Sequence, residues 1–251
     1  MPCCGLHALR PLVRARRRDR VRLRRLSYLA VARQSCASGG KLASVESGHR
    51  VSARFHKVVG AVLAGGQSAR MGRDKGTLVV TRGDGAAETL GARAVRVLRE
   101  AGCDDVVCLG HGRGVPDDVA RVADVADLGP VGGVLALVRG VPADVYCVMP
   151  VDMPGLEGVH LRTLIDALAS ADASARVAVF ARGGVIEPLP FAMRKSACAV
   201  VEERVGAGVR KIVSLLEATG VVTVAITDHA VIRNVNTLAD FEENPRLAED
   251  R

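Results

Sequence analysis

A glycine-rich segment holds the first residues suited to chemistry. Residues 64–75 have the sequence AGGQSARMGRDK and follow a short apolar run. Because Gly65 and Gly66 lack side chains, the backbone there can approach a polyphosphate and present its N–H groups to it. Arg70 and Lys75 add positive charge that neutralises phosphate oxygens. The segment matches neither the GxGxxG fingerprint nor the P-loop GxxxxGK[ST], so dehydrogenases and ATPases are disfavoured. The sequence therefore predicts a phosphate-binding loop here. The alternative is a glycine-rich surface turn that carries charge.

An aspartate further along the chain is the second candidate. Asp152 follows the apolar run 145–149 and precedes Met153-Pro154. We therefore expect its carboxylate at the carboxyl edge of a sheet. Mg²⁺ in phosphate chemistry binds one or two carboxylates together with phosphate oxygens and water. The sequence predicts that Asp152 is a Mg²⁺ ligand. The alternative is that Asp152 caps the following helix, and the two roles are compatible.

Alternating strands and helices must bring these residues to one edge. Short runs of apolar, often β-branched residues predict buried strands at 58–63, 105–109, 145–149, 175–180 and 221–226. Apolar residues at helical spacing predict helices at 86–101, 158–170 and 209–218, and a further apolar helix opens at Gly132-Gly133. This alternation predicts a single α/β domain with a doubly wound, mostly parallel, Rossmann-like sheet. Such sheets bind ligands at the carboxyl ends of their strands.

Charge divides the chain into two segments. Residues 1–57 contain 14 of the 35 Lys and Arg residues and two of the 27 acidic residues, which leaves 21 basic and 25 acidic residues in 58–251. We expect 1–57 to be a basic, disordered leader, because nothing in it alternates or repeats well enough to build a core. The leader also lacks the apolar region of a secretory signal. Its composition also suits a transit peptide or a tail for nucleic acid or membrane surfaces. The mildly acidic segment 58–251 is expected to form the domain and to bind no nucleic acid.

Composition disfavours several other classes of protein. Aromatic residues make up 2% of the chain and Trp is absent, which argues against stacking platforms for single-stranded nucleic acid. No stretch reaches 18 consecutive apolar residues, so we expect no membrane-spanning helix. The seven cysteines are odd in number and irregularly spaced. This pattern predicts reduced, mostly buried thiols of a cytoplasmic protein.

The glycine-rich segment resembles a known signature. Residues 63–75 match every specified position of LAGGxSxRMGxDK. That signature is typical of the molybdenum cofactor guanylyltransferases, which are MobA-like NTP transferases, and of relatives that activate sugars or cofactors with an NTP. Five later segments resemble further motifs of the family in the same order, namely 127–133, 148–154, 187–192, 208–211 and 234–237. The resemblance covers about residues 58–245.

The resemblance implies a nucleotide site built from several segments. The residues that it assigns to the nucleotide are Leu63, Ala64, Gly65, Gly66, Lys75, Asp124 and Asp152. The same Asp152 is the implied metal ligand. A carboxylate at Asp124 can accept hydrogen bonds from the N1–H and N2–H₂ groups that guanine has and adenine lacks. Asp127 is an alternative for this role. The alternative for both residues is that they are solvated acids of a loop and do not contact the base.

A second group of residues is assigned to the acceptor substrate. Arg210, with Lys211, either holds the anionic phosphate of a pterin or lies on a solvated helix face. Asn234 and Asn236 bind substrate, brace a loop of the site, or only shape a turn.

The implied reaction is the transfer of GMP from GTP to molybdenum-bound molybdopterin. Arg70, Lys75 and Asp152 are its expected catalytic residues, and Mg²⁺ is its cofactor. The expected partners are GTP, molybdopterin and, transiently, molybdenum-insertion proteins or acceptor molybdoenzymes. We expect a cytoplasmic monomer or weak oligomer with no membrane association. The alternatives are cytidylyl transfer to molybdopterin, a sugar-phosphate or phospholactate nucleotidyltransferase, a non-catalytic nucleotide-binding protein, and a nucleic-acid binder that uses the basic leader.

Overall fold

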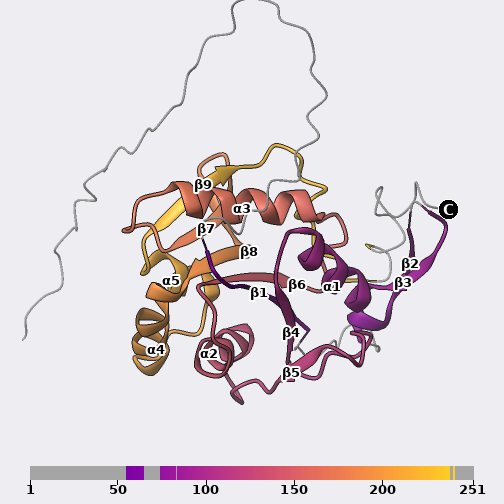
Figure 1. The fold of residues 1–251 in the computed structure, drawn as a ribbon, viewed down its shortest axis with the longest axis horizontal. Coiled ribbons are helices and arrows are strands. Elements are labelled where there is room, and N and C mark those ends of the chain that lie inside the picture. Colours follow the sequence, from indigo (N-terminus) through magenta and orange to yellow (C-terminus); the bar gives the residue numbers. More distant parts are fainter. Residues whose placement is uncertain (1–54, 65–73, 83, 238–239, 241–251) are drawn as a thin grey trace, which may run out of the picture. The chain divides into compact units, whose positions relative to one another are not determined.

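A computed structural model describes residues 55–64, 74–82, 84–237 and 240 (Figure 1). Its main sheet has the strand order β5-β4-β1-β6-β8-β7-β9. These strands are β1 (Val58–Leu63), β4 (Asp105–Leu109), β5 (Ala120–Val122), β6 (Val145–Pro150), β7 (Val177–Arg182), β8 (Val185–Arg194) and β9 (Val221–Ala225). The helices are α1 (Leu90–Glu100), α2 (Pro130–Gly140), α3 (Gly158–Ser170), α4 (Cys198–Gly206) and α5 (Ile212–Glu217). A separate hairpin pairs β2 (Val79–Thr81) with β3 (Ala87–Thr89), and η2 (Lys75–Thr77) and η3 (Lys195–Ala197) are single 3₁₀ turns.

The main sheet is mostly parallel, which confirms the predicted fold class. Strand β1 pairs in parallel with β4 and β6, β4 with β5, and β7 with β9. Strand β8 is antiparallel to both of its neighbours, β6 and β7. The register between β7 and β8 passes from Val179–Phe191 to Phe180–Glu187. The skipped residues include Pro188 and Pro190, which have no N–H to donate to the sheet.

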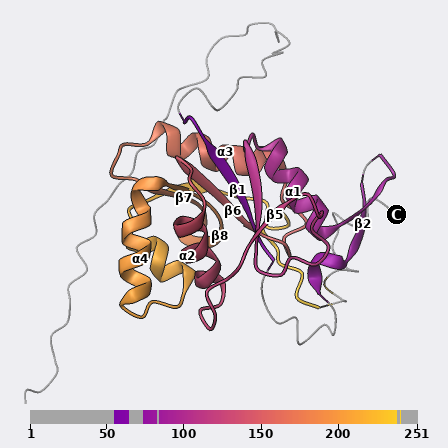
Figure 2. The same cartoon turned by 60° about the horizontal axis from the view of Figure 1, so that its bottom comes forward.

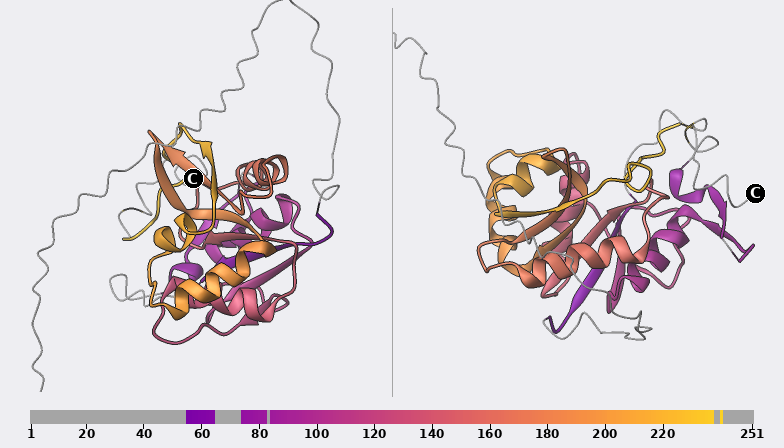
Figure 3. Two further views of the ribbon diagram at one scale, coloured as in Figure 1. Left: turned by 90° about the vertical axis from the view of Figure 1, so that its left-hand side faces the viewer. Right: turned by 90° about the horizontal axis from the view of Figure 1, so that it is seen from above.

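Two apolar cores lie on opposite faces of the sheet because neighbouring residues of a strand point to opposite faces. In β1, Val58 and Val62 pack into the core that contains residues of α1 and α3. Val59 and Ala61 pack into the core that contains residues of α2, α4 and α5. Figure 2 shows α2 and α4 side by side on their face, and the right panel of Figure 3 shows α3 beside α1 on the other. Burial on both faces explains why these strands are continuously apolar.

Two expected helices begin later than the sequence indicates. The segment expected to be helical from Ala86 is extended at Ala87–Thr89, because these residues pair with β2. Helix α1 then begins at Leu90, where Thr89 Oγ1 accepts a hydrogen bond from Ala92 N at 3.1 Å. The side chain of Thr89 therefore caps the helix at a point that apolar spacing does not reveal.

The helix expected over 209–218 is the shorter α5, which begins at Ile212. Residues 209–211 instead lie between α5 and α4, a helix that the sequence analysis did not predict, and Val209 helps to cap the end of α4. Gly208 has a φ of 92°, and Val209 N donates to Arg204 O at 3.0 Å. This arrangement is a Schellman cap, in which glycine takes the left-handed conformation without a steric cost.

The described cysteines bear out the prediction of free thiols. Cys103, Cys108 and Cys147 are buried, Cys198 is partly buried, and all four are unpaired. Within the described ranges, every helix is too short or too polar to cross a bilayer. Residues 1–54 lie outside the described residues, so the leader stays a prediction.

Candidate active site

The carboxyl ends of β1, β4 and β6 meet at one edge of the sheet. Leu63 at the end of β1 is in register with Leu109 of β4 and with Pro150 of β6. The chain runs from β1 to β4 and later returns to β6 on the other side of β1, so the strand order switches beside β1. Open α/β sheets bind their ligands at such a switch. Lys75 follows β1 along the chain and Asp152 follows β6.

Lys75, Asp152 and Asn236 form a polar cluster at this edge. Lys75 Nζ donates to Asp152 Oδ2 at 2.8 Å and to Asn236 Oδ1 at 3.0 Å. The side chains of Lys75 and Asp152 are 18% and 17% exposed, so solvent still reaches the ion pair. The sequence analysis named all three residues without pairing them. Together they offer an ammonium group for phosphate oxygens and a carboxylate for a divalent cation.

Tight local packing fixes the position of Lys75. Asp74 caps η2, since its Oδ1 accepts a hydrogen bond from Gly76 N at 2.9 Å. A Cβ on Gly76 would lie 2.3 Å from Arg113 O, in the loop after β4. Glycine is therefore required at position 76. The close approach holds the turn that carries Lys75 against the rest of the sheet edge.

Asn236 is held by a capping box that the sequence analysis did not identify. Asp240 Oδ2 accepts hydrogen bonds from Asn236 N at 3.0 Å and from Thr237 N at 2.9 Å, and Thr237 Oγ1 accepts one from Asp240 N. The hydrogen bond with the Thr237 side chain, followed by that from Asn236 N, lowers the pKa of Asp240. In addition, Val235 N donates to Asp152 O at 2.8 Å. The Thr-x-x-Asp spacing was the available signal in the sequence.

Asp124 lies in the connection between β5 and α2, close to the first turn of α2 and to the end of β1. A Cβ on Gly133 would lie 3.0 Å from Asp124 Oδ1 and 3.2 Å from Leu63 Cδ2, so these groups surround one point of close approach. Burial raises the pKa of the Asp124 carboxyl, and nearby His111 opposes this effect. Asp124 and the alternative acid, Asp127, are both exposed residues, and Asp127 has a φ of 62°.

Leu63 and Ala64 contribute to the frame of the site through their backbones. Leu63 O accepts a hydrogen bond from Val151 N at 3.1 Å, and Ala64 N donates to Leu109 O at 3.2 Å. These bonds join β1 to the residues that follow β6 and to β4. The predicted phosphate-binding residues Gly65, Gly66 and Arg70 come next in the chain and lie outside the described residues.

The remaining predicted residues stand apart from the cluster. Arg210 Nη1 donates to Val205 O and Val209 O at 3.0 Å each, so this guanidinium braces the end of α4. Asn234 is exposed. Within the described part of the chain, no hydrogen bond or ion pair joins either residue to Lys75, Asp152 or Asn236.

The carboxylate of Asp152 is a donor group of the kind that holds Mg²⁺ in proteins. Among the described residues, no group of three or more His, Cys, Asp or Glu side chains could enclose a metal ion. Mg²⁺ keeps several waters and commonly takes one or two carboxylates plus phosphate oxygens. Asp152 offers such a carboxylate at the sheet edge, where it forms an ion pair with Lys75.

The fold and the site define a class of protein, an α/β transferase that handles nucleotides. The family model described as "MobA-like NTP transferase domain" matches residues 60–222. A relative from Opitutus terrae, described as "Probable molybdenum cofactor guanylyltransferase", is 37% identical over 167 residues, which cover 64% of this chain and 78% of the relative. One with the same description from Mycobacterium marinum is 31% identical over 73% of this chain and 91% of its own length.

A solved structure agrees at the level of the fold. A nucleotidyl transferase from Methanothermobacter thermautotroptrophicus superposes with a TM-score of 0.61 at 20% identity, covering 78% of this chain and 99% of its own. The chain therefore belongs to the MobA-like NTP transferase family.

Proposed function

We propose that this protein transfers GMP from GTP to molybdenum-bound molybdopterin and releases pyrophosphate. The observation that carries the proposal is the convergence of Lys75, Asp152 and Asn236 at the carboxyl edge of β1 and β6. The identity to relatives described as guanylyltransferases supports the choice of nucleotide and acceptor.

The reaction needs positioning and charge neutralisation more than acid–base chemistry. An oxygen of the terminal phosphate of molybdopterin attacks the α-phosphorus of GTP, and the bond from that phosphorus to the β-phosphate oxygen breaks. The attacking phosphate is already ionised near neutral pH, so no side chain has to remove a proton. Catalysis then rests on groups that hold the two phosphates in line and offset the charge on the departing pyrophosphate.

The described residues have distinct roles in this proposal. Lys75 neutralises phosphate oxygens next to the glycine-rich segment, and Asn236 orients the Lys75 ammonium group. Asp152 would hold Mg²⁺, which when bound supplies positive charge to the phosphates. Asp124 would accept from the guanine base, since its carboxylate lies beside β1. Arg70, Gly65 and Gly66 complete the proposed phosphate site.

Pyrophosphate release measures the proposed function directly. The full chain is assayed with Mg²⁺, metal-loaded molybdopterin and each of the four NTPs in turn. We expect release with GTP that depends on the acceptor. Release with CTP instead would indicate cytidylyl transfer, and turnover only with a sugar phosphate or phospholactate would identify another acceptor. A folded chain that binds GTP but releases no pyrophosphate with any acceptor would be a nucleotide-binding protein.

We also propose that the enzyme works in the cytoplasm as a monomer or weak oligomer. Unpaired cysteines among the described residues agree with a reducing compartment. Sedimentation of the purified full chain would measure its oligomeric state.

A further inference from the structure

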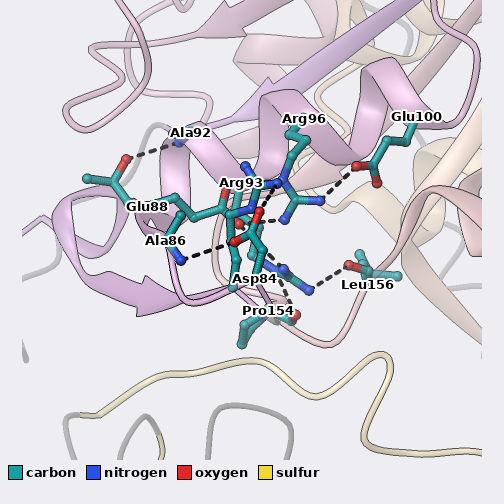
Figure 4. Close-up of polar contacts among 11 residues, drawn as sticks. Asp84, Ala86, Glu88, Ala92, Arg93, Arg96, Glu100, Pro154 and Leu156 are labelled. Carbon is teal, nitrogen blue, oxygen red and sulfur yellow. Dashed lines mark hydrogen bonds and ion pairs between the residues drawn. The ribbon is translucent and has the colours of Figure 1, made fainter. Parts of the chain in front are cut away.

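A group of shielded charges joins β3 to α1. Glu88 of β3 contacts Arg93 and Arg96 of α1, and Arg96 also contacts Glu100 (Figure 4). The side chains of Glu88, Arg93 and Arg96 are 10%, 20% and 27% exposed. Charged groups that are this shielded are stable only with well-placed partners. None of the four belongs to the segments that resemble the family's motifs.

Arg93 extends from this group to the turn that carries Asp152. Its Nε donates to Pro154 O at 3.0 Å and its Nη2 to Leu156 O at 3.4 Å (Figure 4). Both carbonyls belong to segment 151–157, which connects β6 to α3 and contains Asp152. The planar guanidinium presents its donors at fixed angles, so it holds the two carbonyls in one orientation. Burial lowers the pKa of Arg93, and Glu88 opposes that effect.

The backbone of Glu88 is also paired with the segment that follows Lys75. Lys75 begins η2, and β2 follows within the same short stretch. In the hairpin, Val80 of β2 is paired with Glu88 of β3. Leu90 N, at the start of α1, donates to Leu78 O at 2.8 Å. Glu88 and Arg93 therefore connect the chain around Lys75 to the chain after Asp152.

We propose that Arg93, held in place by Glu88, is a positioning residue that keeps Asp152 within reach of Lys75. The inference rests on the proposed function only for the roles of Lys75 and Asp152 toward the nucleotide. The turn is also held by a second contact, because a Cβ on Gly155 would lie 2.2 Å from Ala230 O. Loss of the Arg93 contacts therefore loosens the turn while this packing remains, and the domain stays folded.

Two substitutions of matched size separate positioning from general stability. Arg93→Met and Arg96→Met both keep an unbranched apolar side chain and remove a guanidinium that contacts Glu88. Arg96 lies on the same helix at similar exposure, and its described hydrogen bonds go to Glu88 and Glu100 rather than to the turn. The measurements on the full chain are hydrogen exchange of the amides at 153–157, kcat and KM for GTP, and the unfolding midpoint.

We expect Arg93→Met to speed amide exchange at 153–157 by about tenfold, as for the loss of a charge-assisted hydrogen bond. We expect kcat to fall by about 10- to 10²-fold, because small displacements of a reacting group have effects of this size, while KM for GTP changes little. Arg96→Met should leave exchange at 153–157 unchanged and retain kcat at a similar unfolding midpoint. Arg93→Lys, which keeps the charge and a donor, should recover part of both losses.

Two results would overturn the proposal. One is unchanged exchange at 153–157 in both Arg93→Met and Arg93→Lys. The other is an equal loss of kcat in Arg93→Met and Arg96→Met, which would indicate general destabilisation. Hydrogen exchange needs no substrate. A wild-type chain that is inactive with GTP would therefore refute the proposed function alone, and the exchange data would still test whether Arg93 holds the turn.

Discussion

Replacing Asp152 by alanine separates the proposed catalytic role from a structural one. The change removes Asp152 Oδ2, which accepts from Lys75 Nζ at 2.8 Å, and leaves Asn236 Oδ1 as the acceptor of Lys75 among the described residues. A hydrogen bond between charged groups stabilises a protein by about 1.5–3 kcal/mol. Because the pair is partly exposed, we expect a loss of about 1–2 kcal/mol in the free energy of unfolding.

That loss is too small to unfold the chain. Domains are typically stable by about 5–15 kcal/mol, and each kcal/mol lowers the unfolding midpoint by about 2–4 °C in a domain of about 200 residues. The expected loss of activity is larger. Removing one group that stabilises transition-state charge lowers kcat by about 10²-fold or more, so we expect at least that loss of GTP-dependent pyrophosphate release in a folded variant.

Asp144→Ala is the matched control at the other end of the same strand. Asp144 directly precedes β6, and its Oδ2 accepts hydrogen bonds from His56 N and Lys57 N at 2.9 Å each. Its loss should destabilise the domain by a similar amount without changing kcat, because it lies at the amino end of β6. Both variants are compared by steady-state pyrophosphate release and by thermal unfolding.

Near-wild-type turnover in folded Asp152→Ala would refute the reasoning, since the carboxylate would then not be needed to hold charge at the phosphates. Equal losses of kcat in Asp152→Ala and Asp144→Ala would also refute it, because the effect would not depend on the edge of the sheet at which the carboxylate lies.

Three further predictions test other parts of the chain. Burial raises the pKa of Asp124, so its ionised form opposes folding as pH rises through that pKa. Near neutral pH, Asp124→Asn should hold or raise the unfolding midpoint while GTP binding, measured by calorimetry, weakens by about 10- to 10²-fold; a lower midpoint would contradict this. Burial also raises the pKa of Cys108 to about 11, so peptide mapping after alkylation of the native chain near neutral pH should find this thiol unmodified. A chain that starts at Arg54 should stay folded and keep the kcat of the full chain, and an insoluble or inactive product would show that the leader is needed.

Local features of the sequence were enough to predict much of the fold. Strands buried on both faces need continuous apolar runs, so β1, β4 and β6 could be located from residue type alone. Glycines followed by Lys75, and an aspartate after a buried strand, predicted a candidate site at the carboxyl edge of the sheet. Each of these signals depends on neighbours within a few residues.

Pairings between distant residues were decided by the tertiary structure. Ala87–Thr89 lies within the segment expected to be helical but is extended, because a partner strand, β2, competes for its backbone hydrogen bonds. Strand β8 contains two prolines, and its pairing with β7 skips the residues between Glu187 and Phe191, where both prolines lie. The spacing of apolar residues also did not predict helix α4 or the Schellman cap that ends it.

The chemistry of the site shows the same division. The sequence supplied Lys75, Asp152 and Asn236 as separate candidates, because side-chain type determines which groups can bind phosphate or a cation. Lys75 is 77 residues from Asp152 and 161 residues from Asn236 along the chain, and no local pattern specifies contacts over such separations. The parallel register of β1 with β6 brings Lys75 and Asp152 to the same edge of the sheet, and the hydrogen bond from Val235 N to Asp152 O brings Asn236 beside them.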